Sequence, residues 1–105
     1  MSDPLSPLDD VVNQRDRLSI LAVLAEARRA EHDYLRDSLQ LSDGNLASHL
    51  QVLENAGFVS IAEELQGARR RAWVQATPAG RQAFRGRLAS LHGDQHGAAR
   101  PTRPQ

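Results

Sequence analysis

The sequence of 105 residues contains no cysteine, and every one of its basic residues is an arginine. Without cysteine the chain can form no disulfide, no thiolate zinc site and no cysteine nucleophile. No apolar run approaches the roughly 20 residues that span a bilayer. The N-terminus lacks the basic and apolar regions of a signal peptide. We therefore expect a soluble, cytoplasmic protein with no membrane partner.

Groupings of residues that would indicate an enzyme are also missing. No Ser/His/Asp arrangement stands in a motif, no glycine-rich phosphate loop is present, and the carboxylates are scattered. The length suits one small domain with one modest core. His92 and His96, with Asp94 between them, have the spacing of metal ligands, but Gly93 and Gly97 disfavour a helix there. We therefore expect no enzyme, no cofactor and no metal site.

Negative charge is almost missing from the C-terminal part of the chain. Residues 1–68 hold five arginines and twelve acidic residues, whereas residues 69–105 hold eight arginines and the single acid Asp94. The net charge is nevertheless zero. The asymmetry reflects either an arginine-rich codon usage or an anion-binding half of the chain, and composition leaves both explanations open.

Periodicity and capping residues predict three helices in the first 40 residues. Ser6 and Pro7 favour a short first helix over about 7–14. Asp16 would cap a second helix, and a third is expected over about 33–40. The face that the second helix buries would carry Leu18, Leu21, Leu24 and Ala25, with Ile20 beside them.

A fourth helix is predicted over about 43–56, capped by Ser42 and ended by Gly57. A short helix, a tight turn and a longer capped helix make a helix-turn-helix, whose second helix enters the DNA major groove. On a helical wheel, Leu46, Leu50 and Leu53 form the core stripe. The opposite face is uncharged and carries Gly44, Asn45, Ser48, Gln51, Val52 and Asn55.

This uncharged face indicates contact with base edges, because amides and hydroxyls approach bases without repelling phosphate, and Asn or Gln forms two bonds with adenine. The same face would also suit packing against another protein, but its place after a helix-turn-helix turn favours DNA. His49 lies at the boundary between the two faces. It either contacts phosphate or a base, or is half-buried and bonded to a neighbour, and the sequence leaves both open.

Two alternating segments, 58–62 and 71–76, predict a β-hairpin with Gly67 at the first position of a type II′ turn. This turn pairs Ile61 with Val74, Val59 with Ala76 and Glu64 with Arg71. With only two strands expected, the fold class is α+β, mostly α.

Three arginines, Arg69, Arg70 and Arg71, directly follow the hairpin turn. Adjacent guanidiniums on a protruding loop suit phosphates or a narrow minor groove. The alternative is a solvated loop in which Arg71 pairs with Glu64.

A last helix is predicted from Pro78 to about Leu91, after the capping residue Thr77. Residues 93–105 are rich in Gly, Pro and Arg without apolar rhythm, which predicts a disordered tail. We therefore expect one domain over residues 1–92.

Five segments appear in a fixed order: RLSIL at 17–21, LSDGNLASHL at 41–50, LENAGFV at 53–59, GARRR at 67–71 and TPAGR at 77–81. Together they resemble bacterial winged-helix transcriptional regulators of the ArsR/MarR-like group, in particular its small stand-alone members. The resemblance implies a winged helix-turn-helix fold with flanking terminal helices. It also implies a DNA-binding regulator, a repressor in our interpretation.

Proteins of that group act as homodimers on roughly palindromic operators, so the implied partners are double-stranded DNA and a second copy of the chain. A small-molecule effector of unknown identity is a further partner. The first and last helices are the expected dimer elements, through Leu8, Val11, Phe84, Leu88 and Leu91. Two alternatives stay open: these residues complete the core of the monomer, or the domain binds another protein and not DNA.

Overall fold

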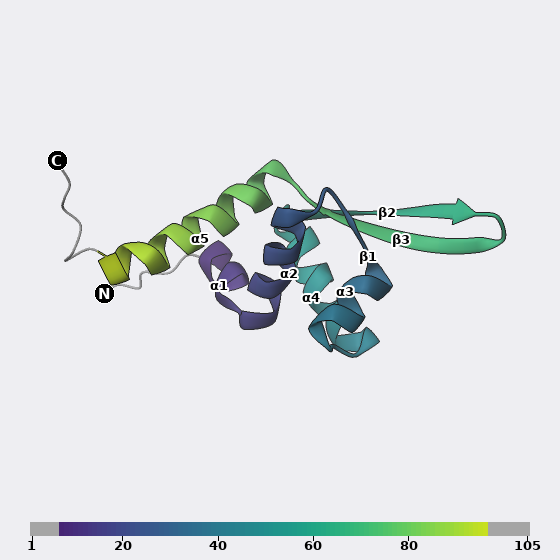
Figure 1. The fold of residues 1–105 in the computed structure, drawn as a ribbon, viewed down its shortest axis with the longest axis horizontal. Coiled ribbons are helices and arrows are strands. Elements are labelled where there is room, and N and C mark those ends of the chain that lie inside the picture. Colours follow the sequence, from purple (N-terminus) through teal and green to yellow (C-terminus); the bar gives the residue numbers. More distant parts are fainter. Residues whose placement is uncertain (1–6, 97–105) are drawn as a thin grey trace.

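The computed structural model describes the backbone of residues 7–96 and the side chains of residues 10–90. The first four helices form one body, from which a β-hairpin projects at one end and the last helix at the other (Figure 1). The elements are α1 Pro7–Asn13, α2 Arg15–Glu26, β1 Ala30–Glu31, α3 His32–Leu39, α4 Asp43–Asn55, β2 Val59–Gln66, β3 Arg69–Ala76 and α5 Pro78–His96. The predicted α+β, mostly helical fold class is confirmed.

The hairpin of β2 and β3 has the predicted register. Val59 pairs with Ala76, Ile61 with Val74 and Glu64 with Arg71. Gly67 has φ +64°, and no residue other than glycine near the turn has a positive φ. A type I′ turn would need positive φ at both central residues, so the turn geometry agrees with the predicted type II′.

The sheet has three strands in the order β1-β3-β2, all antiparallel, and not the two strands that we expected. The additional strand is Ala30–Glu31, with Ala30 opposite Val74. Two residues show no periodicity, and neither Ala nor Glu favours a strand. Only pairing with β3 makes this segment a strand, so no pattern within the segment could have predicted it.

The core lies where α2, α3 and α4 meet the base of the sheet. Leu46, Leu50 and Leu53 of α4 are at most 2% exposed, which confirms the predicted core stripe. In α2, Ile20, Leu21 and Leu24 are buried and Leu18 is partly buried, as predicted. Ala25 is exposed, so its place on the buried face was wrong. The other buried hydrophobic residues are Val12, Ala30, Leu35, Phe58, Val59, Val74 and Ala76.

The ends of α2 and α4 show how local sequence sets the helix boundaries. Gln14, and not Asp16 as expected, caps α2, because its side-chain oxygen accepts from the backbone N–H of Arg17 at 2.9 Å. The predicted cap of α4 is confirmed, since Ser42 Oγ accepts from the N–H of Asn45 at 3.1 Å. Gly57, at φ +81°, ends α4.

The last helix begins after Thr77 as predicted. Its end differs: we expected about Leu91, but the backbone is helical to His96. A glycine inside a helix costs only about 1 kcal/mol, so Gly93 does not suffice to stop it. The first four residues of the predicted tail, 93–96, therefore belong to α5. The rest of the predicted tail, residues 97–105, lies outside the described residues. Ser6, the predicted cap of the first helix, also lies outside them.

Candidate nucleic-acid interface

The predicted DNA-facing residues of α4 form an exposed polar surface. Ser42 caps the helix, and the buried leucines fix which face is turned away from the core. The exposed members of the predicted set are Gly44, Asn45, Ser48, Gln51 and Asn55, whereas Val52 is half-buried. Gln51 Nε2 lies 3.4 Å from Asn55 Oδ1, one turn further along. The side chains at these positions are uncharged and accessible to a macromolecule.

A cluster of charges that the sequence analysis missed holds α3 against the start of α4. The Arg36 guanidinium donates to Asp37 at 2.9 Å and to Asp43 at 3.0 Å. The hydrogen bond from Arg36 lowers the pKa of Asp37 below its usual value. Because Asp43 is the first residue of α4, Arg36 ties the two helices of the helix-turn-helix together. A lone arginine among carboxylates one to seven residues away was the available signal.

His49 lies between α4 and the start of α2, and not on the open face of α4. Its Nε2 is 3.4 Å from Asp16 Oδ2, and its Nδ1 is 3.3 Å from a terminal nitrogen of Arg17. Only 16% of its side chain is exposed. Of the two interpretations that the sequence left open, this geometry is that of the half-buried histidine bonded to its neighbours.

The three arginines after the hairpin turn differ in what they contact. Arg71 donates to both carboxylate oxygens of Glu31 at 2.8 Å, in a partly buried pair. Arg70 is exposed and lies 3.2 Å from Glu63. Arg69 is exposed and has no carboxylate partner among the side chains that the structure describes. The wing, residues 59–76, therefore presents Arg69 as its least restrained cation.

The alternative pairing of Arg71 with Glu64 was wrong. Glu64 pairs with Arg29 at 2.9 Å instead. The guanidinium of Arg29 also lies over the ring of Trp73, 4.0 Å from its centroid, which is cation–π geometry. Glu31, Arg71, Glu64 and Trp73 lie on the same face of the sheet, because Glu31 pairs with Trp73 and Glu64 with Arg71 in the register. Arg29 and Glu31 therefore stabilise the base of the wing from this face.

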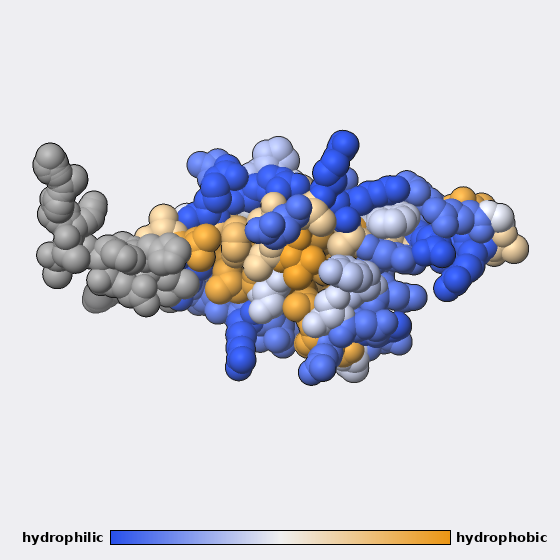
Figure 2. Space-filling model, in the orientation of Figure 1, coloured by the Kyte–Doolittle hydropathy of each residue, from blue (hydrophilic) through white to orange (hydrophobic). Residues whose placement is uncertain are grey.

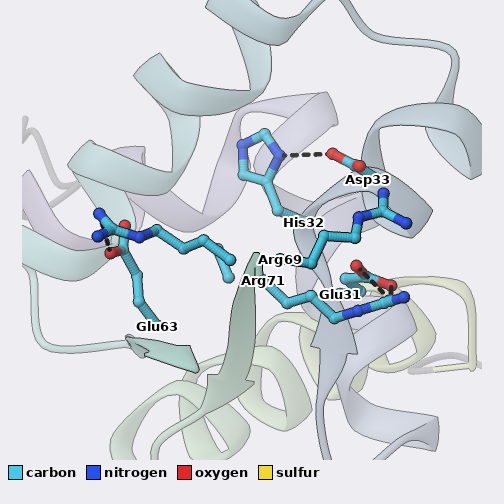
Figure 3. A pocket seen from close by; sticks show the side chains of 8 residues that line it. Glu31, His32, Asp33, Glu63, Arg69 and Arg71 are labelled. Atoms are coloured by element: carbon cyan, nitrogen blue, oxygen red, sulfur yellow. Dashed lines mark hydrogen bonds and ion pairs between the residues drawn. The ribbon is translucent and has the colours of Figure 1, made fainter. Parts of the chain in front are cut away.

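A hollow of about 360 Å³ lies between the start of α3 and the wing (Figure 3). His32 and Asp33 line it from α3, 3.6 Å apart, and Glu31 joins Arg71 at its side. Its complete lining is Glu31, His32, Asp33, Glu63, Arg69, Arg70, Arg71 and Ala72. Three arginines balance three carboxylates here, so this hollow is not an electropositive anion site.

The residues predicted for dimerisation have different environments. Val11 and Phe84 are partly buried against the core. This agrees with the alternative in which these residues complete the core of the monomer. Leu88 is 40% exposed. The side chains of Leu8 and Leu91 lie outside the described part of the structure. Hydrophobic residues gather over the helical body, whereas the wing is mostly hydrophilic (Figure 2).

Within the described residues, no group of three or more His, Asp or Glu side chains could hold a metal ion. The side chains of His92, Asp94 and His96 lie outside that part. The described helices include none that is long and apolar enough to cross a bilayer.

A helix-turn-helix followed by an antiparallel hairpin, with a third strand at the base of the sheet, defines a winged-helix protein. Comparison with known families agrees. The family model described as winged helix DNA-binding domain matches residues 17–93, and the chain belongs to this family. Its fold and family are those of a DNA-binding regulator, not of an enzyme. The resemblance found in the sequence is thereby confirmed at the level of winged-helix transcriptional regulators.

Similar proteins come from several organisms. An uncharacterised protein of Methanocaldococcus jannaschii is 37% identical over 75 residues, which cover 71% of this chain and 82% of that protein. A transcriptional regulator homologue from Pyrococcus horikoshii has a TM-score of 0.79 at 30% identity, covering 87% of this chain and 90% of that one. The structure of MepR from S. aureus in complex with DNA has a TM-score of 0.72 at 14% identity, covering 87% and 74%, and shows a shared fold.

Proposed function

We propose that this protein is a sequence-specific DNA-binding regulator that acts as a homodimer in the cytoplasm and represses transcription. The observation that carries the proposal is the exposed, uncharged face of α4. Asn45, Ser48 and Gln51 are exposed there, while Leu46 and Leu50 on the opposite side are buried. Such amides and hydroxyls match the donors and acceptors that base pairs present in the major groove.

The wing supplies the second part of the proposed interface. Arg69 contacts phosphate or the minor groove in this proposal, and Arg70 joins it by exchanging its 3.2 Å pair with Glu63 for a phosphate. Exposed ion pairs of this kind contribute little, about 0–1 kcal/mol, so the exchange costs little. Arg71 braces the wing through Glu31. The three arginines of the sequence motif thus take unequal roles.

The last helix, α5, offers an apolar contact for the proposed homodimer. Leu88 on α5 is one of few large hydrophobic side chains that are exposed among the described residues. Closed dimers with twofold symmetry are the commonest assemblies of soluble proteins, and a dimer would match a palindromic operator. Repression would follow from steric exclusion of RNA polymerase by a dimer bound across a promoter. A small-molecule effector stays a prediction from the resemblance.

The experiment compares affinity for the operator with affinity for random DNA at one fixed salt concentration, the operator being first selected from genomic fragments. Asn45→Ala and Gln51→Ala should lower the operator affinity and leave the weak random-DNA affinity and the folding stability nearly unchanged. Each good bidentate contact with a base contributes about 1–3 kcal/mol of discrimination. The matched control is Ala62→Ser, an exposed change in the wing that removes no charge.

One outcome would favour a different function. Glu31, Glu63 and Glu64 each hold a basic side chain near the wing, which lowers the attraction of this region for phosphate and suits a protein-binding module. If truncation of both Asn45 and Gln51 leaves the ratio of affinities unchanged, α4 does not read sequence. The protein-binding alternative then takes precedence.

A further inference from the structure

The start of α2 carries two charged side chains, Asp16 and Arg17, that contact two other helices, α1 and α4. Arg17 Nε donates to the backbone oxygen of Val11 in α1 at 2.9 Å. The same guanidinium reaches His49 Nδ1 in α4 through its terminal nitrogen at 3.3 Å. Asp16 Oδ2 lies 3.4 Å from the other ring nitrogen of His49. One small network therefore joins α1, α2 and α4.

The hydrogen-bonding requirements of this network select one form of the histidine. Arg17 has only donors, so Nδ1 of His49 must accept. The carboxylate of Asp16, which has only acceptors when ionised, lies 3.4 Å from Nε2 and therefore favours a proton on that nitrogen. The tautomer with its proton on Nε2 and a free lone pair on Nδ1 is therefore the one that suits both neighbours. In that form Arg17 and Asp16 contact the two ring nitrogens from opposite sides, which restricts rotation of the ring toward DNA.

The network also uses a free end of α1. Val11 lies in the last turn of α1, whose carbonyl groups have no partners within the helix. A cation near a helix C-terminus is stabilised by the helix dipole, which holds Arg17 in place. His49 lies in the middle of α4, between Ser48 and Leu50. The orientation of the α4 face that carries Ser48 is therefore tied to α1 through a single guanidinium.

We propose that His49 is a positioning residue, which Arg17 and Asp16 hold so that α4 keeps a fixed orientation relative to α1 and α2. The proposal rests on the DNA-binding function proposed above and adds how that function is maintained. Side chains that read bases must be held within about 0.5 Å by supporting contacts. His49 supplies one such contact, and it does not contact DNA itself. A displacement of α1 would reach α4 by this route.

The first arm of the test is a double-mutant cycle. For each variant it measures the ratio of the affinity for the operator to the affinity for random DNA. His49→Ala and Arg17→Gln should each lower the ratio about tenfold, the effect of losing one hydrogen bond of a charged group. The double variant should lower the ratio by less than the product of the two single effects, because the contact between Arg17 and His49 is lost in both. The matched control is Arg15→Gln, which removes an exposed arginine from the same turn of α2 and should leave the ratio unchanged.

Conservative variants separate the two contacts of the ring. The side-chain oxygen of His49→Asn lies near the position of Nδ1 and keeps the acceptor for Arg17. His49→Gln keeps the donor for Asp16 instead. Partial recovery of the ratio in His49→Asn, but not in an Arg17→Gln background, supports the positioning role. If His49→Ala lowers the ratio while Arg17→Gln does not, His49 contacts DNA and the proposal is overturned. A loss of stability with an unchanged ratio overturns it as well.

The second arm needs no DNA, so it separates failure of this proposal from failure of the proposed function. Nitrogen-15 NMR of the free protein should show His49 as the tautomer protonated on Nε2. Arg17→Gln should shift its Nδ1 resonance and the amide resonances of α4, whereas Arg15→Gln should not. The other tautomer, or α4 amides that ignore Arg17→Gln, would refute the positioning role even if the wild-type protein binds no operator.

Discussion

Gly80 in the first turn of α5 should not tolerate even one methyl group. A Cβ atom placed on Gly80 would meet the backbone oxygen of Phe58 at 2.0 Å and its carbonyl carbon at 2.8 Å. The obstacle is backbone, which cannot move aside as a flexible side chain would. Phe58 is itself held, because its oxygen accepts from the N–H of Thr77 at 3.0 Å. Thr77 Oγ1 also donates to the oxygen of Gly57 at 2.7 Å.

The size of the effect follows from two opposing terms. Gly→Ala inside an exposed helix raises the free energy of unfolding by about 0.5–1 kcal/mol. Forcing extra atoms into a packed site lowers it by about 1–3 kcal/mol, and occasionally by more. At 2.0 Å from backbone the steric term should prevail. Because the contact is with backbone, the steric loss should be about 3 kcal/mol, so we expect Gly80→Ala to lower the free energy of unfolding by about 2 kcal/mol net, once the helix-propensity gain is subtracted.

The same helix offers a matched control. A Cβ on Gly86 would meet nothing within 4 Å, so Gly86→Ala should raise the free energy of unfolding by about 0.5–1 kcal/mol. Urea unfolding followed by circular dichroism measures both values. Each kcal/mol corresponds to a shift in Tm of about 4–8 °C for a domain of this size. If both variants are stabilised equally, α5 does not pack on Phe58 as closely as described, and the reasoning fails.

Two further predictions concern the wing and the proposed dimer. Arg69→Ala should reduce the salt dependence of DNA binding by about one unit of log–log slope per protomer for each phosphate contact. Arg71→Ala should instead lower the free energy of unfolding, because it leaves Glu31 without its partner. Salt titrations and urea unfolding of both variants measure this, and equal slopes for both would show that Arg69 has no special role. Leu88→Glu should give a monomer with unchanged helical circular dichroism in sedimentation experiments, since the residue is 40% exposed in the single chain. Global unfolding of that variant would place Leu88 in the monomer core instead.

Most of the fold could be predicted because short-range patterns determine it. Ser42, Gly57 and Gly67 set a helix start, a helix end and a hairpin turn through their own backbone bonds and φ angles. The alternation of Val59 and Ile61 then fixes the register, since a slip by one residue would turn every apolar side chain outward. The exposed face of α4 was predicted for the same reason, because the spacing of the buried leucines defines the opposite side.

The partners of the charged side chains could not be read from the sequence. Register alone places Arg71 opposite Glu64, but Arg71 binds Glu31, which is 40 residues away in the chain. Likewise Arg17 meets His49 across 32 residues. A long guanidinium reaches several candidates, and the choice depends on which strand or helix the fold brings beside it.

The sequence by itself therefore determined the helices, the hairpin, its register and the uncharged face of α4, because these depend on neighbours within a few residues. The tertiary structure alone decided the third strand, the close approach of Gly80 to Phe58, and the unequal roles of the wing arginines. It also decided that His49 faces α2 and not the solvent. Each of these depends on the distance between segments that are remote in the chain, and only packing of the whole domain sets such distances.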